Sequence, residues 1–241
     1  MVKVDDLNFT TNWYYNISCE PDSKENGWAA DKIAACVIRS EGVYGMVAAL
    51  QSTLIQLFSR GSALPVSKIF IEDWPMFPVR GMMIDMGRRF VPKDAILHDI
   101  IDGMALFRMN LIHLHLNDFC RFTIDLPGFP ELNKSLAGIS EGQYSVREVG
   151  EIIEYANARG IMVLPEIDLP GHASGLLALE ERGMKFCKPK PGSQPRPEEA
   201  AKVHDDPAGE TRKLLYELFS ETFDVFNMSH GLNWFHVGGD E

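Results

Sequence analysis

Apolar and polar residues follow two patterns along this chain of 241 residues. Short runs that are apolar throughout are typical of strands buried on both faces of a parallel sheet, whereas apolar residues three and four positions apart indicate helices with one buried face. From residue 79 onward the two patterns alternate. They predict strands at residues 79–86, 110–118, 161–168 and 233–241, and helices at residues 92–109, 145–160 and 210–226.

Two of the predicted helices carry further signals. Ser145 is followed three residues later by Glu148, which is the pattern of a capping box, and Gly160 predicts the end of that helix. The helix at residues 210–226 shows one apolar stripe. The stripe consists of Leu215, Leu218, Phe219, Thr222, Phe223 and Phe226.

The alternation of strands and helices predicts an α/β fold with a parallel sheet. Each predicted strand ends in polar residues, and in a (β/α)8 barrel the carboxyl ends of the strands carry the active site. A doubly wound open sheet would also place a ligand there. The barrel is favoured because no glycine-rich phosphate loop follows the first strand. Residues 76–241 are therefore predicted to form the first four strands of a (β/α)8 barrel.

The part before the barrel has a mixed pattern. Residues 13–18, 33–38 and 67–73 are predicted strands, and residues 42–58 have the spacing of an amphipathic helix. The proline-containing stretch DWPMFP, residues 73–78, indicates a turn between the two parts. Residues 1–75 are predicted to be part of a small N-terminal α/β domain.

Residues 187–209 hold five of the fourteen prolines and predict a long loop after the third barrel strand. Long loops at such positions are either functional lids or inserts. The pattern leaves both possibilities open.

The charge of the chain limits its partners. The formal net charge is -11, which repels nucleic-acid phosphates and anionic membrane surfaces. We therefore expect neither nucleic acid nor a membrane as a partner. No apolar run has the character of a membrane span or a signal peptide.

The cysteines and asparagines bear on the compartment. The four cysteines, Cys19, Cys36, Cys120 and Cys187, show no CxxC spacing, so a zinc cluster is not predicted and their redox state is open. Four of the ten asparagines begin glycosylation sequons, where about one is expected by chance. This excess favours a lysosomal, extracellular or other secretory-pathway parent protein with a signal outside this chain. A chance excess is the alternative.

The most suggestive pair of residues is Asp240 and Glu241, at the end of the stretch FHVGGDE. Cleavage of a glycosidic bond needs one carboxylic acid and one negative group, and neighbouring carboxyls push their pKa values apart. Strand alternation would point the two side chains to opposite faces, so the strand must end or kink here. Gly238 and Gly239 would leave room for a ligand. The alternative is a solvated strand end.

Three further candidates lie at predicted strand ends. Asp118 follows the second strand, and the turn DLPGH places His172 after the third. A carboxylate beside an imidazole fixes its tautomer, so the two would form a pair if their strands are neighbours. Arg88, after the first strand, suits sugar hydroxyls, and its alternative is a surface ion pair.

Two histidines allow a second kind of chemistry. His113 and His115, at positions i and i+2 of a predicted strand, share one face and would suit a metal. The favoured alternative is a pair of core histidines, and we expect no metal and no cofactor.

Five motifs occur in a fixed order: RGMMIDMGRRF, MNLIHLHLND, PGFPEL, GIMVLPEIDLPGH and FHVGGDE. With this order and spacing, residues 78–241 resemble glycoside hydrolase family 20, the β-N-acetylhexosaminidases. The predicted helix at residues 42–58 is also similar to the last helix of that family's small N-terminal domain. The ordered set is specific, although no single motif would be.

The resemblance implies a substrate-assisted, retaining mechanism on terminal N-acetylhexosamine residues of glycans. It implies that Asp240 orients the acetamido group and stabilises its developing charge, and that Glu241 is the general acid/base. Arg88 matches the arginine that binds sugar hydroxyls. Asp118 and His172 match a supporting pair beside the acid/base. A homodimer is a further possibility for the full-length parent protein.

The chain departs from the family pattern in two ways. Phe119 stands where the family usually has a second acidic residue. The barrel strands five to eight, which carry the aromatic box around the sugar, are absent from these 241 residues. We therefore expect the chain by itself to be an inactive fragment. A non-catalytic carbohydrate-binding or interaction remnant of the same fold is the alternative function, and a metal-dependent hydrolase using His113 and His115 is a third.

Overall fold

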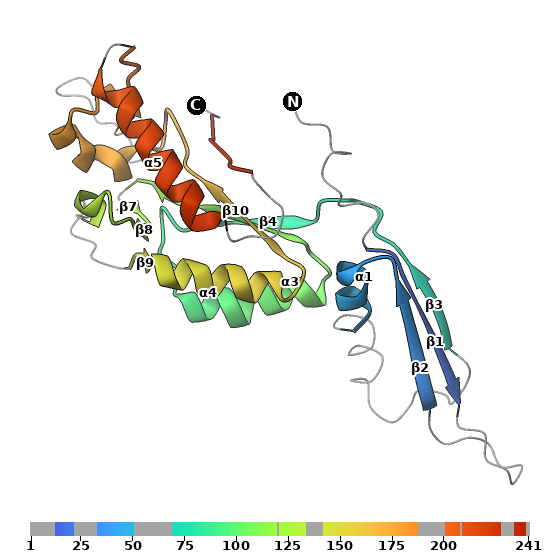
Figure 1. Ribbon diagram of the computed structural model, residues 1–241. Helices are drawn as coiled ribbons and strands as arrows, with labels where there is room; N and C mark the ends of the chain where they lie inside the picture. The colour runs from blue at the N-terminus through green and yellow to red at the C-terminus, as the bar shows by residue number, and fades with distance from the viewer. Residues whose placement is uncertain are drawn as a thin grey trace, which may run out of the picture. The chain divides into compact units, whose positions relative to one another are not determined.

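The computed structural model (Figure 1) describes residues 13–21, 33–50, 69–119, 121–133, 142–187, 201–207, 209–227 and 234–239. The chain forms two compact units. The first comprises residues 1–80 and 102–110, and the second comprises residues 81–101 and 111–241. The predicted domain limit at residue 75 stays a prediction.

The first unit is built on a three-stranded antiparallel sheet with the order β2-β1-β3. Its strands are β1 (Tyr15–Pro21), β2 (Ile33–Ser40) and β3 (Ile69–Asp73), and α1 (Val43–Val47) follows β2. These elements confirm the three predicted strands and the start of the predicted helix. Its continuation to residue 58 lies outside the described residues. Alternate residues of β1 are buried, and with α1 they form a core.

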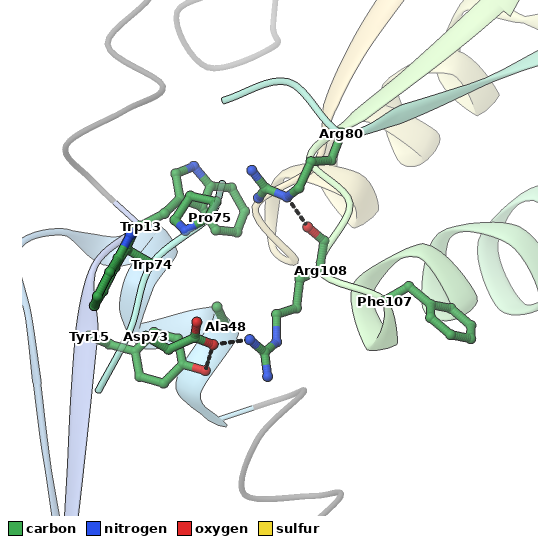
Figure 2. A pocket seen from close by; sticks show the side chains of 9 residues that line it. All are labelled: Trp13, Tyr15, Ala48, Asp73, Trp74, Pro75, Arg80, Phe107 and Arg108. Carbon is green, nitrogen blue, oxygen red and sulfur yellow. Dashed lines mark hydrogen bonds and ion pairs between the residues drawn. The ribbon is translucent and has the colours of Figure 1, made fainter. Parts of the chain in front are cut away.

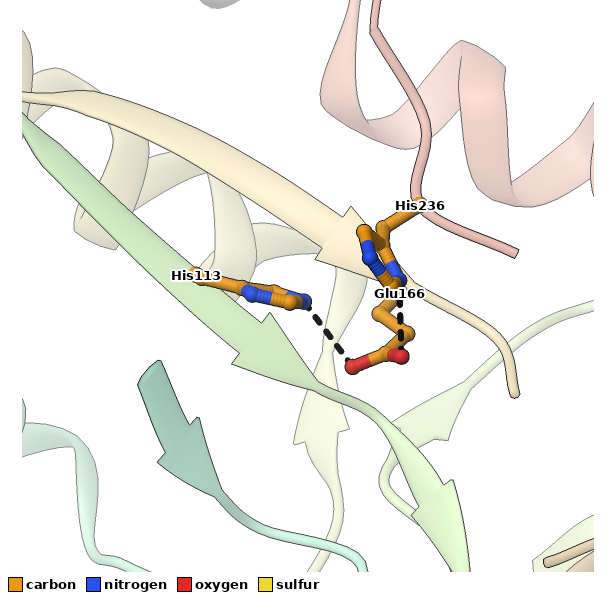
Figure 3. A group of neighbouring side chains, drawn as sticks. All are labelled: His113, Glu166 and His236. Carbon is orange, nitrogen blue, oxygen red and sulfur yellow. Dashed lines mark ion pairs between the residues drawn. The ribbon is translucent and has the colours of Figure 1, made fainter. Parts of the chain in front are cut away.

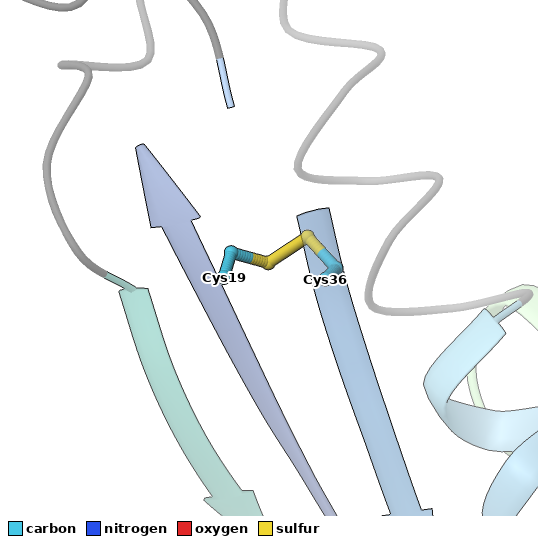
Figure 4. The surroundings of a disulfide bond; sticks show 2 residues. All are labelled: Cys19 and Cys36. Carbon is cyan, nitrogen blue, oxygen red and sulfur yellow. A yellow bond between two sulfur atoms is a disulfide. The ribbon is translucent and has the colours of Figure 1, made fainter. Parts of the chain in front are cut away.

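A disulfide joins the two longest strands of this sheet. Cys19 and Cys36 are directly opposite each other in the register of β1 and β2, and their sulfurs are bonded (Figure 4). Cys187 is an exposed free thiol, and Cys120 lies outside the described residues. Disulfides persist in oxidising compartments, so this bond agrees with the compartment that the excess of sequons favours.

The second unit is built on parallel strands that neighbour each other in chain order. The strands β4 (Gly81–Asp85), β5 (Leu111–His115) and β10 (Met162–Glu166) pair in the order β10-β5-β4. The fourth predicted strand pairs with β10 through a parallel bridge between Glu166 and His236. The predicted parallel sheet is therefore confirmed, and this order is that of the first four strands of a (β/α)8 barrel.

The predicted helices are present, with one change. The helix predicted at residues 92–109 contains a π-helical segment, Ala95–Ile101, before α3 (Asp102–Leu106). The helix α4 (Val146–Asn157) begins at Ser145 with the predicted capping box, in which the Glu148 N–H donates to Ser145 Oγ over 3.2 Å. Gly160 adopts a positive φ of 71° just beyond this helix.

The helix α5 (Glu210–Phe226) has the predicted bounds, but its buried face is centred differently. Leu214 is buried, whereas Leu215, Phe219 and Phe223 of the predicted stripe are only partly buried. The buried residues are Thr211, Leu214, Leu218, Thr222 and Phe226. Leu218, Thr222 and Phe226 of the predicted stripe are buried, and Thr211 and Leu214 lie on the buried face although the stripe omitted them. The buried Thr222 hydroxyl donates to the Leu218 carbonyl over 2.8 Å within the helix.

The strand predicted at residues 110–118 is divided into β5 and β6 (Asn117–Asp118). Several other short elements were not predicted. They are β7 (Arg121–Phe122), β8 (Ile124–Asp125), η4 (Pro130–Asn133), β9 (Tyr144–Ser145), η5 (Ser174–Arg182), β11 (Phe186–Cys187) and β12 (Lys202–Val203). The pairing of β11 with β12 closes the base of the proline-rich loop. Among the described residues, no helix combines the length and apolar character that a membrane crossing requires.

Candidate active site

The polar residues that follow the parallel strands gather at one edge of the sheet, because parallel strands present their carboxyl ends together. Arg88 follows β4, Asp118 ends β6 just after β5, and His172 lies in the turn after β10. The structure brings these three predicted residues into mutual contact. Their polar atoms meet around one oxygen atom of Asp118.

Asp118 Oδ2 is the centre of this group. It lies 2.9 Å from His115 Nε2, 3.0 Å from Arg88 Nη2 and 3.1 Å from His172 Nδ1. The Asp118 side chain is completely buried, and the Phe119 N–H donates to its other oxygen. Burial raises the pKa of this carboxyl, but the bonds from His115 and Phe119 and the nearby cationic groups hold it below its usual range.

Arg88 is held between two carboxylates. Its Nη1 donates to Asp85 Oδ2 over 2.7 Å, while Nη2 faces Asp118. Its side chain retains 44% of its accessible surface. The guanidinium is therefore fixed on one side by the buried Asp118 and the partly buried Asp85, and it remains reachable from solvent on the other, as a group that binds a hydroxyl-rich ligand must be.

His172 is held in place through its backbone. Its φ angle is 50°, in the left-handed region that a non-glycine residue seldom adopts. The buried Asn117 side chain donates to the carbonyls of Asp168 and His172 over 3.0 and 3.1 Å and accepts from the Asp168 N–H over 2.7 Å. Asn117 thus ties both ends of the turn to β6, and strain of this kind is common at functional sites.

The ring of His172 has two competing partners. Its Nδ1 lies 3.1 Å from Asp118 Oδ2 and 3.2 Å from Arg88 Nη2. A ring nitrogen carries either a hydrogen atom or a lone pair. Nδ1 can therefore donate to Asp118 or accept from Arg88, but it cannot do both at once.

A second cluster surrounds the buried carboxylate of Glu166 and is joined to the first through His115. His113 Nε2 lies 2.9 Å from Oε2, and His236 Nδ1 lies 2.8 Å from Oε1 (Figure 3). His115 Nδ1 also lies 2.7 Å from Oε2. Burial would raise the pKa of Glu166, but its contacts with His113 and His115 hold it well below its usual range. The two strand histidines share one face, as predicted. The spacing of His113, Glu166 and His236 would admit a cation, although both oxygens of Glu166 already have imidazole partners.

The glycines before the predicted acidic pair break the fourth strand. Gly238 and Gly239 have positive φ angles of 65° and 97°, so the extended backbone of the fourth strand ends at these two residues. A Cβ on Gly238 would lie 1.5 Å from Asp168 Oδ1. The expectation that Gly238 leaves room for a ligand is wrong, because the space beside it holds the Asp168 carboxylate, which also accepts from the Gly239 N–H over 3.1 Å.

The predicted site is therefore partly visible. Arg88, Asp118 and His172 meet, whereas Asp240 and Glu241 lie outside the described residues. The sequence interpretation missed the roles of Asn117 and Glu166. The i, i+2 histidines were a signal for a polar face on β5, but nothing in the pattern identified the carboxylate opposite them.

A cavity of about 180 Å³ in the first unit is separate from these residues. Its walls include Trp13, Asp73, Trp74, Arg80 and Arg108 (Figure 2). Arg108 is paired with Asp73, and the Arg80 guanidinium donates from Nε to the Arg108 carbonyl over 2.8 Å. None of the predicted site residues lines this cavity.

The family model and the sequence relatives that match this chain indicate the same family. The family model described as glycosyl hydrolase family 20, catalytic domain, matches residues 77–241. A beta-hexosaminidase of Akkermansia muciniphila is 36% identical over 215 residues, covering 84% of this chain and 41% of that protein. Beta-hexosaminidase 1 of Coccidioides posadasii is 32% identical over 219 residues, covering 88% of this chain and 36% of that protein.

Solved structures agree with the sequence relatives. The crystal structure of a beta-N-acetylhexosaminidase matches with a TM-score of 0.74 and 32% identity, covering 95% of this chain and 48% of that one. The Flavobacterium johnsoniae chitobiase matches with a TM-score of 0.70 and 29% identity, covering 95% of this chain and 32% of that one. The chain spans 36% and 41% of the two curated relatives named above.

Proposed function

This chain belongs to glycosyl hydrolase family 20, and from that membership we propose that the complete protein is a β-N-acetylhexosaminidase. It would remove N-acetylhexosamine residues from the non-reducing ends of glycans. The beta-hexosaminidase relatives support this activity. The observation that supports it for this chain is the meeting of Arg88, Asp118 and His172 at the carboxyl ends of strands to which the fourth strand is bridged at His236. In the sequence, Asp240 and Glu241 follow that strand directly.

The proposed reaction uses the substrate's own acetamido group as the nucleophile. The acetamido carbonyl oxygen attacks the anomeric carbon while the bond to the leaving oxygen breaks, and Glu241 protonates that oxygen. Asp240 orients the acetamido group and stabilises the positive charge of the oxazolinium ion. Glu241 then removes a proton from water as the water attacks the anomeric carbon. Two displacements at this carbon retain the anomeric configuration.

The described residues support this chemistry. Arg88 binds hydroxyls of the terminal sugar from its solvent-reachable side. When it does, its hold on His172 Nδ1 weakens and Nδ1 is left to donate to the ionised Asp118. The other ring nitrogen of His172 then has a defined protonation state, which lets it act as the partner of Glu241.

The proposal is tested by assaying the complete protein on a glycan with a terminal N-acetylhexosamine. Glu241→Gln and Asp240→Asn should each lower turnover, the former by about 10²–10⁴-fold because general acid catalysis is lost. Glu154→Gln, at an exposed position of α4, is the matched control and should leave turnover unchanged.

NMR of the first-formed sugar provides the second test. The product should have the same anomeric configuration as the substrate. An inverted product, or near wild-type turnover in both acidic variants, would contradict the mechanism.

A further inference from the structure

His115 lies between the two clusters. It does not line the cavity of the first unit, and it is linked to Arg88, the predicted substrate-binding residue, only through Asp118. We propose that His115 is a positioning residue, held as a doubly protonated imidazolium, that keeps Asp118 ionised and aimed at His172. This inference rests on the proposed function for its catalytic consequence. The charge state of His115 itself follows from geometry that is independent of any activity.

The two ring nitrogens of His115 both face carboxylates. Nδ1 lies 2.7 Å from Glu166 Oε2, and Nε2 lies 2.9 Å from Asp118 Oδ2. An ionised carboxylate can only accept hydrogen bonds, and a neutral imidazole has one N–H and one lone pair. A neutral ring would therefore direct a lone pair at an anionic oxygen. Only the imidazolium satisfies both contacts.

Both carboxylates are surrounded by donors, so neither is a good place for the proton. Asp118 also has Arg88, His172 and the Phe119 N–H around its two oxygens. Glu166 Oε2 also has His113 Nε2 beside it at 2.9 Å, and its contacts with His113 and His115 hold the pKa of Glu166 well below its usual range. A carboxylic acid proton on Asp118, or on the Glu166 oxygen that faces the ring, would therefore be disfavoured. On the His115 ring, by contrast, a proton on Nδ1 faces Glu166 Oε2 and a proton on Nε2 faces Asp118 Oδ2, so each proton has an acceptor.

The charges around His115 favour the same state. The ring and both of its acidic partners are buried. Burial lowers the pKa of His115, but the hydrogen bonds to Asp118 and Glu166, together with the negative charge of Asp85, raise it to about 10. The other ionisable groups that face it are Asp168 from the turn after β10, His113 on its own strand, and His172 and Arg88 across Asp118.

The catalytic consequence concerns the moment at which Arg88 engages the sugar. Arg88 then shares its guanidinium between Asp118 and the sugar, and a buried carboxyl whose cationic partner is weakened takes up a proton more readily. The fixed imidazolium of His115 remains bound to the same oxygen. Asp118 therefore stays an acceptor for His172 throughout the reaction.

Two substitutions separate this role from simple packing. The amide nitrogen of Gln can occupy the place of Nε2, and that of Asn the place of Nδ1. His115→Gln should retain a donor to Asp118, whereas His115→Asn should retain one to Glu166 only. We expect His115→Asn to lower kcat by about 10²-fold with little change in KM, because a misplaced positioning group costs about this much, and His115→Gln to lower it less.

The pH profile gives a readout that a packing role would not change. In His115→Asn the acidic limb of kcat should move to higher pH, because Asp118 becomes easier to protonate. His98→Asn, on an exposed helical surface, is the control and should leave kcat and the profile unchanged. Equal kcat losses in the Gln and Asn variants, with an unshifted profile, would overturn the positioning role.

The closing experiment is NMR of the complete protein labelled with ¹⁵N in its histidine rings, with the His115 signals assigned from their loss in His115→Gln. Both ring nitrogens should carry protons at pH 8, and the ring should titrate near pH 10. A neutral ring at pH 8 would overturn the proposal. This outcome is distinct from failure of the proposed function, because the charge state is measured whether or not the protein hydrolyses a hexosaminide.

Discussion

At the scale of single residues, the site depends on side chains that bind backbone rather than substrate. Asn117 makes three hydrogen bonds to the turn that carries His172 and is completely buried. These bonds stabilise the positive φ of His172, because a strained residue persists only when its surroundings over-determine it. The orientation of the His172 imidazole is therefore determined by its backbone, which Asn117 of β6 holds in place.

Gly238 provides a prediction at this scale. A side chain there would meet the Asp168 carboxylate, and the φ of 65° would strain any L-residue. Gly238→Ala should therefore lower the free energy of unfolding by about 1–3 kcal/mol and reduce turnover by displacing Asp240 and Glu241. Urea denaturation and kcat of the complete protein measure the two effects.

Gly103→Ala is the matched control, since a Cβ at that helical glycine meets nothing within 4 Å. It should be neutral or slightly stabilising. A Gly238→Ala protein as stable and active as the wild type would show that Asp168 can move aside at no cost.

Three residues of the site could be predicted from the sequence because of their position after apolar strands. Arg88, Asp118 and His172 stand out because they are polar residues directly after apolar strands, and the parallel order brings strand ends together. Asn117 and Glu166 are also polar residues near the ends of apolar strands, but their functions depend on which backbone or imidazole lies opposite. That information is contained in the register of neighbouring strands, which the linear pattern does not specify.

At the scale of elements, the strands and helices of the second unit were predictable because their apolar patterns are long and regular. The π-helical segment at Ala95–Ile101 was not, because one extra residue in a turn scarcely changes the spacing of apolar positions. The helix bounds of α5 were correct, whereas its buried face was only partly predicted: Leu218, Thr222 and Phe226 are buried, but the stripe omitted Thr211 and Leu214. Thr211 is polar and therefore adds nothing to an apolar pattern.

The capping box of α4 gives the prediction at this scale. Ser145 Oγ accepts from the Glu148 N–H, and the Ser145 N–H donates to the Glu148 carboxylate over 2.9 Å. Ser145→Ala should lower the free energy of unfolding by about 1 kcal/mol, because an N–H of the first turn loses its acceptor. Thermal or urea denaturation measures this loss.

Glu154→Ala, at an exposed position of the same helix, is the control and should change stability by less than about 0.5 kcal/mol. If both substitutions had the same small effect, the cap would contribute nothing beyond an ordinary surface residue.

At the scale of the whole molecule, the described residues include four of the eight parallel strands of a (β/α)8 barrel, and these strands expose apolar side chains. Met83 on β4 is 52% exposed, and Val237 on the fourth strand is 55% exposed. An aromatic groove of about 380 Å³ lies along α5, lined by Tyr216, Phe219 and Phe235 among others. Such edges and patches favour association with other protein surfaces.

We therefore expect residues 1–241, produced alone, to show no measurable hexosaminidase activity and to form oligomers or aggregates. Catalysis requires walls that exclude water and hold the substrate in line for attack, and half a barrel supplies them on one side only. An aryl N-acetylglucosaminide assay with size-exclusion chromatography of the same sample tests this. A monomer with turnover similar to that of the complete protein would refute it.

The disulfide between Cys19 and Cys36 also has a consequence for the integrity of the chain after cleavage. It closes a covalent ring that includes every peptide bond between the two cysteines. A protease that cut within this ring would produce a nicked protein whose two pieces stay attached through sulfur. The product would migrate as one species on a non-reducing gel and separate into two only after reduction, so β1 and β2 would remain partners even when the segment that connects them had been cut.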